Sequence, residues 1–152
     1  YTYTIDYTGG VTAPTDDTET VECPDDAVNP GAPATVQDAC GRDVVPVYVG
    51  VTSDPDPVTC EGTVEYKWSY TDCTDVVDYY TFTYTVKDTT DPEIINLPEV
   101  SPLCNDAFPG ELFADWTDNC GEGGTNLSSG APVITDFECY QEGVYTFYVE
   151  DN

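Results

Sequence analysis

The stretch YTFTYTVKDTTDP, residues 80–92, decides the fold of this chain. In its first half, threonine and lysine alternate with four apolar side chains, Tyr80, Phe82, Tyr84 and Val86. This period of two is typical of a β-strand with one buried face and one face in water. The second half ends the strand, because Pro92 donates no backbone hydrogen bond and disfavours helical geometry in the residue before it. The stretch therefore predicts the last strand of one domain, followed by a junction.

The composition of the 152 residues is strongly acidic and rich in cysteine. Thirty Asp and Glu stand against three Lys and Arg, with seven Cys and no His. The net charge of -27 argues against nucleic acid and anionic membranes as partners, because phosphate binding needs clustered cations. No apolar run approaches the ~20 residues of a membrane span, so we expect no membrane insertion.

The lack of histidine and the abundance of cysteine further limit the classes of function that the chain can have. Without His the chain lacks the usual general base and the commonest metal ligand, so we expect no enzyme. Cysteine at this density, with no CxxC pair, indicates disulfides in an oxidising compartment rather than zinc. Thr, Val, Tyr, Gly and Pro dominate and no helical period appears, so the predicted class is all-β.

Two further segments are expected to be strands. The apolar run at residues 44–51 contains Pro46, which predicts an edge strand or a bulge. After Cys60, apolar and polar residues alternate, and the apolar side chains are expected to point inward: Val64, Tyr66, Trp68 and Tyr70. We expect these aromatic side chains to form the core.

The chain repeats itself after about 80 residues. Cys104 follows Cys23 by 81 positions, and Cys139 follows Cys60 by 79. The sequence DNCG at residues 118–121 corresponds in the same way to DACG at residues 38–41. A fixed period of this length predicts two tandem domains of the same fold.

The expected boundaries place two immunoglobulin-like β-sandwiches at residues 9–88 and 89–152, the second without its last strand. Residues 1–8, YTYTIDYT, have the pattern of a closing strand that belongs to a preceding or neighbouring repeat. We expect Tyr1, Tyr3 and Ile5 to contact a neighbouring copy or the missing edge of a preceding domain, because an uncovered apolar edge would aggregate. The segment is then either part of a long tandem array or the repeat of a filament.

The disulfide pairing follows from strand length. Cys60 and Cys73 flank one strand and lie roughly 40 Å apart, beyond the ~7 Å limit between bonded Cα atoms. In a sandwich the strands that end at Cys40 and Cys73 meet at one pole. We therefore predict the pairs Cys40–Cys73, Cys23–Cys60 and Cys104–Cys139, and a partner for Cys120 beyond residue 152. Pairing of the first with the second cysteine and the third with the fourth stays open if the Cys60 strand is a hairpin, and a free Cys120 thiol is the other alternative.

The order of these motifs resembles a known family. A Cys, a DNCG turn, a second Cys, an aromatic strand with an Asp-x-Cys turn and a TxTxTV strand ending in DTTDP are similar to the HYR-like, immunoglobulin-like repeats of giant Bacteroidetes surface adhesins, including the gliding-motility adhesins. The resemblance covers nearly the whole chain, although Thr74 and Asp75 replace the Gly-Asn that usually follows the last Cys. It implies a secreted, non-catalytic stalk or filament at the cell surface.

Carboxylate and amide oxygens gather at the expected junction between the repeats. Oxygen ligands of this kind bind Ca²⁺, so we expect a calcium ion there, held by Asp88, Asp91, Asp118, Asn119 and Asp151. The alternative is that Asp and Asn are present because they favour turns. Asp88-Thr89-Thr90 also resembles the Asp-Thr-x motif at which Bacteroidetes attach O-glycans, so Thr89 is a candidate for glycosylation.

The sequence thus predicts a mechanical repeat segment of an extracellular surface filament or adhesin stalk, with neighbouring copies head to tail as partners. The alternative is a carbohydrate-binding β-sandwich module that takes surface polysaccharide. Tyr48, Trp116 and Tyr148 are the aromatic residues expected on the surface for that role. A glycosidase would need two acids about 5 to 9 Å apart across a cleft. Among 30 acids some pair meets this requirement by chance, so the acids do not indicate catalysis.

Overall fold

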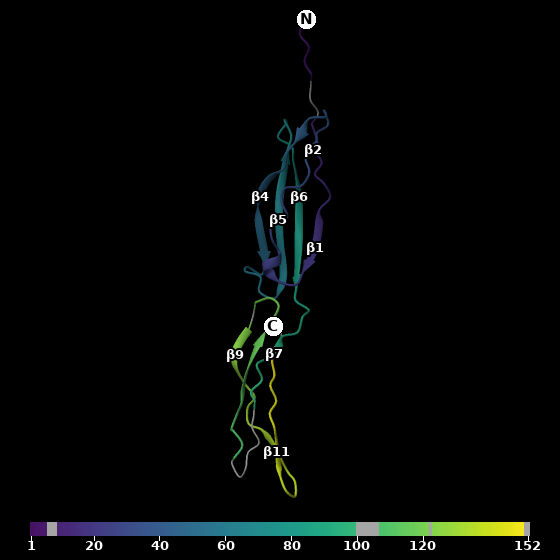
Figure 1. The fold of residues 1–152 in the computed structure, drawn as a ribbon. Coiled ribbons are helices and arrows are strands. Elements are labelled where there is room, and N and C mark those ends of the chain that lie inside the picture. Colours follow the sequence, from purple (N-terminus) through teal and green to yellow (C-terminus); the bar gives the residue numbers. More distant parts are fainter. Residues whose placement is uncertain (6–8, 100–106, 122, 151–152) are drawn as a thin grey trace. The chain divides into compact units, whose positions relative to one another are not determined.

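A computed structural model describes residues 1–5, 9–99, 107–121 and 123–150 (Figure 1). The chain divides into two compact units, unit 1 from Tyr1 to Asp88 and unit 2 from Thr89 to Asn152. Apart from one turn of 3-10 helix, η1 (Pro24–Asp26), every regular element in the described residues is a strand. The predicted class, all-β with immunoglobulin-like β-sandwich units, is confirmed. Across the same residues, no helix is long and apolar enough to cross a membrane.

Unit 1 is built on a four-stranded sheet in the order β1-β6-β5-β4 (Figure 1). The strand β5 is antiparallel to both of its neighbours, whereas β1 runs parallel to β6. A small second pair, β2 with β3, is also antiparallel. The bounds are β1 Asp17–Val21, β2 Val36–Gln37, β3 Asp43–Val44, β4 Val47–Asp54, β5 Glu61–Thr71 and β6 Val77–Lys87.

The aromatic side chains of β5 and β6 form the centre of unit 1. Trp68 pairs with Tyr80 and Tyr66 with Phe82, so their rings lie on the same face of the sheet. Trp68 is 2% exposed, and its ring centroid lies 5.8 Å from that of Tyr80. The predicted inward face of β5 is confirmed, because Trp68 and Tyr70 are buried and Tyr66 packs against the same cluster.

Two tyrosine hydroxyls attach this face to the chain that covers it. Tyr66 donates to the carbonyl oxygen of Ala27 at 2.8 Å, and Tyr70 donates to the carbonyl oxygen of Ala34 at 2.7 Å. A buried hydroxyl without a partner would cost free energy, so these bonds make a tyrosine-rich core tolerable. In the described residues the covering chain that contains Ala27 and Ala34 is mostly irregular, so the tyrosine hydroxyls help to hold it in place.

The strand β4 lies at the edge of the sheet, as the proline predicts. Pro46 separates β3 from β4, and the pairing register of β4 shifts between Tyr48 and Gly50, which marks a bulge. The edge strand β1 was not predicted, because its side chains are acidic or polar and mostly exposed. Its place in the sheet is fixed by backbone pairing from Asp17 opposite Phe82 to Val21 opposite Val86.

Unit 2 contains a three-stranded sheet, β7-β8-β9, and a separate hairpin of β10 and β11 (Figure 1). Among the described residues of unit 2, Ala114 is the one buried apolar side chain of the core. Tyr145, the counterpart of Tyr66, donates its hydroxyl to the carbonyl oxygen of Pro109 at 2.7 Å. The bounds are β7 Glu93–Ile95, β8 Phe113–Thr117, β9 Gly123–Ser128, β10 Val133–Asp136 and β11 Gln141–Val144.

The first residues of the chain differ from the expectation of a strand. Residues 1–5 form no strand in the structure, and residues 6–8 lie outside the described residues. Tyr1, Tyr3 and Ile5 are fully or almost fully exposed, with Tyr3 and Ile5 at 88%. A strand needs a neighbouring strand for its backbone hydrogen bonds, and none is described beside these residues.

Replacing Trp68 with alanine will test the aromatic core. We expect Trp68→Ala to lower the free energy of unfolding of unit 1 by about 3–5 kcal/mol, because the large cavity left behind cannot close fully. Urea unfolding followed by far-ultraviolet circular dichroism measures the loss. The control is Val28→Ala, whose side chain is 61% exposed. Equal stability of the two variants would contradict the assignment of the core.

Candidate functional site

Two loops with the same hydrogen bonds lie at one end of unit 1. In the first, Oδ1 of Asp38 accepts backbone N–H bonds from Cys40 at 2.8 Å and Arg42 at 3.0 Å. In the second, Oδ1 of Asp72 accepts the corresponding bonds from Thr74 at 2.7 Å and Val76 at 3.0 Å. Each aspartate thus closes a five-residue loop by binding the amides two and four positions after it.

The fourth position of each loop has a left-handed backbone. Gly41 has φ of 74° and Asp75 has φ of 63° at the same place in the two loops. In unit 2 the DNCG turn repeats this feature, with Gly121 at φ of 83° and the N–H of Cys120 donating to Asp118 at 3.2 Å. Glycine adopts this conformation without strain, and Asp tolerates it better than most residues. The Asp-x-Cys-Gly motif therefore indicates a loop of this conformation, and by itself it does not indicate a binding site.

The two loops share one electrostatic environment. Asp38 and Asp72 are 7% and 5% exposed, and the charge of Asp38 tends to raise the pKa of Asp72. Arg42 offsets this repulsion, because its Nε lies 2.9 Å from Oδ2 of Asp38. Burial raises the pKa of Asp72, but the bonds from Thr74 and Val76 outweigh burial and hold this pKa below 3.8. The site therefore keeps a buried carboxylate charged.

One oxygen in this site has no hydrogen-bond partner. Oδ2 of Asp72 is buried and accepts no hydrogen bond from the described residues. The guanidinium of Arg42 reaches the neighbouring loop, where it donates to Sγ of Cys73. The sequence predicted turns at these aspartates but not their burial, because burial depends on the two loops lying together.

The predicted disulfide partners Cys40 and Cys73 lie in these two adjacent loops. Cys40, Cys60, Cys73 and Cys139 are free thiols in the structure, so the predicted bonds are not formed in it. Cys104 lies outside the described residues, so the pair Cys104–Cys139 is not described. The pairing stays a prediction for the oxidised protein.

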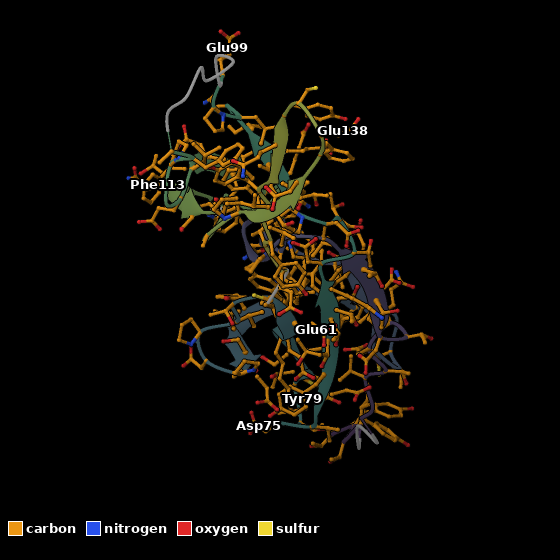
Figure 2. All side chains as sticks on the ribbon, turned by 90° about the horizontal axis from the view of Figure 1, so that it is seen from below. Glu61, Asp75, Tyr79, Glu99, Phe113 and Glu138 are labelled. Carbon is orange, nitrogen blue, oxygen red and sulfur yellow. The ribbon has the colours of Figure 1, made fainter. Side chains whose placement is uncertain are left out.

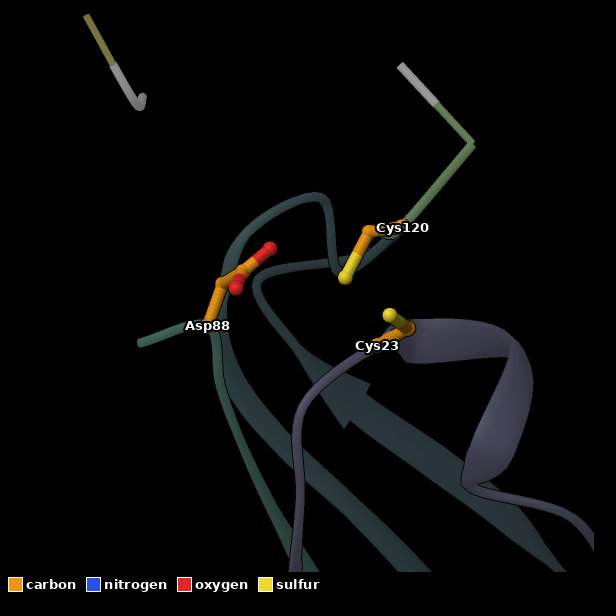
Figure 3. A group of neighbouring side chains, drawn as sticks. All are labelled: Cys23, Asp88 and Cys120. Carbon is orange, nitrogen blue, oxygen red and sulfur yellow. The ribbon is translucent and has the colours of Figure 1, made fainter. Parts of the chain in front are cut away.

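The other end of unit 1 contains Cys23, Cys60 and Asp88. Sγ of Cys23 and a carboxylate oxygen of Asp88 lie within 4.8 Å of each other (Figure 3). Cys120, also drawn there, belongs to unit 2. Cys23 follows β1 and Cys60 precedes β5, and these strands lie on the two sides of β6. Two strand spacings are roughly 10 Å, so a Cys23–Cys60 bond requires the loops to bend towards each other.

The residues predicted to bind calcium are divided between the units. Asp88 is in unit 1, Asp91, Asp118 and Asn119 are in unit 2, and Asp151 lies outside the described residues. Within unit 2, the amide nitrogen of Asn119, in the orientation that its neighbours require, lies 3.1 Å from Oδ2 of Asp118. This bond and the N–H of Cys120 show that Asp118 closes its own turn. Calcium binding by these residues stays a prediction.

The aromatic residues expected on the surface differ in exposure. Tyr48 is 46% exposed, but its ring centroid lies 5.6 Å from that of Trp68 in the core. Trp116 is half-buried, and its indole lies against Gly124. Tyr148 is 68% exposed, and the bond from its hydroxyl to Glu150 raises its pKa. Figure 2 labels several exposed acidic side chains, among them Glu61, Asp75, Glu99 and Glu138.

Sequence reasoning missed a hydrogen bond that joins the start of β6 to the chain before β1. Oδ2 of Asp78 accepts the backbone N–H of Ala13 at 2.8 Å across 65 positions. This bond and the N–H of Tyr79 lower the pKa of Asp78. An aspartate at the start of a strand gives no sequence signal for so distant a partner.

The four cysteines of unit 1 and the loops around them match a known domain family. The family model for the HYR-like domain with 4 cysteines matches residues 11–86, half of the chain. The chain belongs to the HYR-like domain family. No curated protein and no solved structure matches it. HYR-like domains form a non-enzymatic repeat family and occur as adhesion-type modules of extracellular proteins, so the HYR-like unit is an extracellular repeat module.

Acidification will test the charged aspartates of the HYR-like unit. Asp72 and Asp78 have a lower pKa in the folded state, so their stabilisation is present above the ordinary value of 3.8 and is lost as pH falls through the folded pKa. We therefore expect the stability difference between the wild type and a doubly substituted variant, Asp72→Asn with Asp78→Asn, to shrink below about pH 4.

Urea unfolding at a series of pH values measures this difference. The matched control is Asp25→Asn, which changes the net charge at an exposed position. General relief of charge repulsion affects both variants, whereas loss of the loop and strand hydrogen bonds affects only the first. A difference that stays constant with pH would contradict the charged state of the two aspartates.

Proposed function

We propose that this HYR-like chain is a structural segment of a long cell-surface filament or adhesin stalk, of the kind found in the gliding-motility adhesins of Bacteroidetes. The observation that supports it is the repeat itself. The HYR-like unit matched at residues 11–86 is followed by a second unit with the same order of cysteines and turns. A series of such modules extends a chain away from a surface and needs no catalytic centre.

The described architecture suits a mechanical role. The core of unit 1 consists of two strands of 11 residues whose aromatic side chains pack together. The acidic surface keeps copies soluble and resists collapse onto other anionic material. Neighbouring copies of the repeat, head to tail, are the proposed partners.

Surface labelling tests this function. We expect antibodies raised against the 152-residue chain to label intact cells, and external protease to remove the label. Antibodies against a cytoplasmic protein of the same cells serve as the control. A label that appears only after the cells are lysed would contradict an extracellular stalk.

We also propose that Cys40 and Cys73 form a disulfide when the chain is secreted. Two thiols lose two protons and two electrons, which a small-molecule disulfide such as oxidised glutathione accepts. The contact of Arg42 with both Asp38 and Cys73 supports the proposal, because it brings the two loops together.

Serine substitutions will measure what the bond contributes. We expect Cys40→Ser with Cys73→Ser to lower the free energy of unfolding of the oxidised chain by about 2–4 kcal/mol. The same variant should differ little from the wild type under reducing conditions. Mass spectrometry of non-reduced peptides identifies the pairing. Recovery of a Cys60–Cys73 peptide would contradict the predicted arrangement.

Calcium at the junction is a further part of the proposal. Oxygen ligands from Asp88, Asp91, Asp118 and Asn119 have the chemistry that Ca²⁺ prefers. We expect isothermal titration of the chain with CaCl₂ to show one saturable site, weakened at least 10-fold in Asp91→Asn. Asp25→Asn is the control with the same change in charge. Heat changes that are identical for all three proteins would contradict a specific site.

Two surface properties remain as proposals. The alternative function, binding of polysaccharide, rests on the exposed ring of Tyr148, and a glycan array with Tyr148→Ala as the control tests it. Thr89 is exposed, which a glycosylated side chain requires. Mass spectrometry of the protein isolated from its own cells decides whether Thr89 carries a glycan.

A further inference from the structure

The hairpin of β10 and β11 has two stacked aromatic rings at its tip, on either side of Glu138, which Figure 2 labels. The ring centroids of Phe137 and Tyr140 lie 4.5 Å apart, with 13° between the ring planes. The backbone N–H of Phe137 donates to the carbonyl oxygen of Tyr140 at 2.8 Å, so these two residues close the turn. Their side chains are 45% and 61% exposed, although burial of rings of this size would stabilise the fold. Two flat apolar rings are therefore in contact with water at the tip of the hairpin.

The corresponding turn of unit 1 has no aromatic ring. Cys139 follows Cys60 by 79 positions, so the counterpart is the turn between β4 and β5, which contains PDPVTC at residues 55–60. Val58 of this turn is half-buried and packs against the core of unit 1. Both units thus close the hairpin, and unit 1 does so without aromatic side chains. The exposed rings of unit 2 are therefore not a requirement of the shared fold.

A carboxylate and an amide lie directly beside the rings in the chain. Asp136 precedes Phe137, Gln141 follows Tyr140, and the two polar residues lie opposite each other in the hairpin. Nε2 of Gln141 donates to Oδ1 of Asp136. Both side chains are exposed, and each has a second oxygen or N–H group with which it can bind a hydroxyl. The tip therefore combines flat apolar surface with hydrogen-bonding groups.

A third ring lies on the face of the hairpin that carries this polar pair. Residues two positions apart in a strand share a face, so Gly143 lies on the face of Gln141. A side chain at Gly143 would collide with the ring of Phe108, because its Cβ would lie 2.9 Å from Cδ1 of that ring. Unit 1 has Val64 at the position of Gly143, 79 residues earlier. The glycine thus makes room for an aromatic ring on the hairpin.

The charge of the hairpin limits the kind of ligand that it can bind. Glu138 and Glu142 lie in the hairpin beside Asp136, and unit 2 contains no Lys or Arg. An anionic ligand would therefore be repelled, whereas a neutral one would not. A neutral sugar has C–H groups that pack on an aromatic ring and hydroxyls that a carboxylate and an amide bind. These are the two kinds of group that the tip presents.

We propose that the tip of the β10–β11 hairpin binds a neutral carbohydrate. A sugar ring packs on the exposed rings of Phe137 and Tyr140, and its hydroxyls bond to Asp136 and Gln141. The ring of Phe108 provides a contact for a second sugar unit of the same polysaccharide. The inference rests on the alternative function, polysaccharide binding, and assigns it a site.

Affinity electrophoresis of the 152-residue chain tests this site. The native gels contain galactomannan or mixed-linkage β-glucan as neutral polysaccharides, and alginate as an anionic one. We expect a neutral polysaccharide to retard the chain, with about 10-fold weaker binding for Phe137→Leu with Tyr140→Leu, which keeps apolar side chains but removes the flat rings. The conservative variant Phe137→Tyr with Tyr140→Phe should restore most of the binding. Tyr79→Leu is the matched control, because its ring is 49% exposed and belongs to unit 1.

A second variant tests the polar half of the site. We expect Gln141→Ala to weaken binding while leaving both rings in place, so the proposal stays falsifiable if the leucine variant does not fold. Circular dichroism checks the fold of each variant.

Four results would overturn the proposal. They are no retardation by either neutral polysaccharide, equal retardation by alginate, equal binding of the leucine variant and the wild type, and loss of binding in Tyr148→Ala alone. A second copy of the chain is the other occupant to be tested. Oligomers in sedimentation velocity that the leucine variant abolishes would also overturn the sugar site. Surface labelling of cells needs no sugar, so failure of this site is distinguishable from failure of the stalk function.

Discussion

The pairing of β5 with β6 is the interaction on which unit 1 depends. Eleven residue pairs run without a break from Glu61 opposite Lys87 to Thr71 opposite Val77. This pairing places the aromatic rings of both strands on one face, and the tyrosine hydroxyls then fasten the irregular chain above them. The core therefore centres on the aromatic face of two neighbouring strands, and Val11, Ala27 and Val44 from other parts of unit 1 complete it.

The aspartate loops show how a chain with a charge of -27 uses its carboxylates. Asp38 and Asp72 are nearly buried, yet each receives backbone N–H bonds that stabilise its charge. Most other acids remain in water, where mutual repulsion is screened by salt. The acidic composition therefore combines a few structural carboxylates with many that only solvate the surface.

The sequence predicted the elements whose side chains alternate strongly, and it missed those fixed by backbone pairing alone. β5 and β6 follow from their aromatic period, and the edge position of β4 follows from Pro46. β1 gave no signal, because an exposed edge strand needs no apolar side chains. The loop at Asp72 was predicted as a turn, but its contact with the loop at Asp38 depends on tertiary packing. The spacing of the cysteines likewise predicted which of them lie at the same end of a unit. It could not predict whether their sulfur atoms are bonded, because this also depends on tertiary packing.

The parallel pairing of β1 with β6 has a consequence under tension. A pull on the chain before β1 and on the chain after β6 acts in opposite directions along two strands that point the same way. The five residue pairs from Asp17–Phe82 to Val21–Val86 are then loaded in shear. Their hydrogen bonds share the force and do not break one after another. Such a mechanical clamp resists extension at the joint where a pulled module would otherwise begin to unravel.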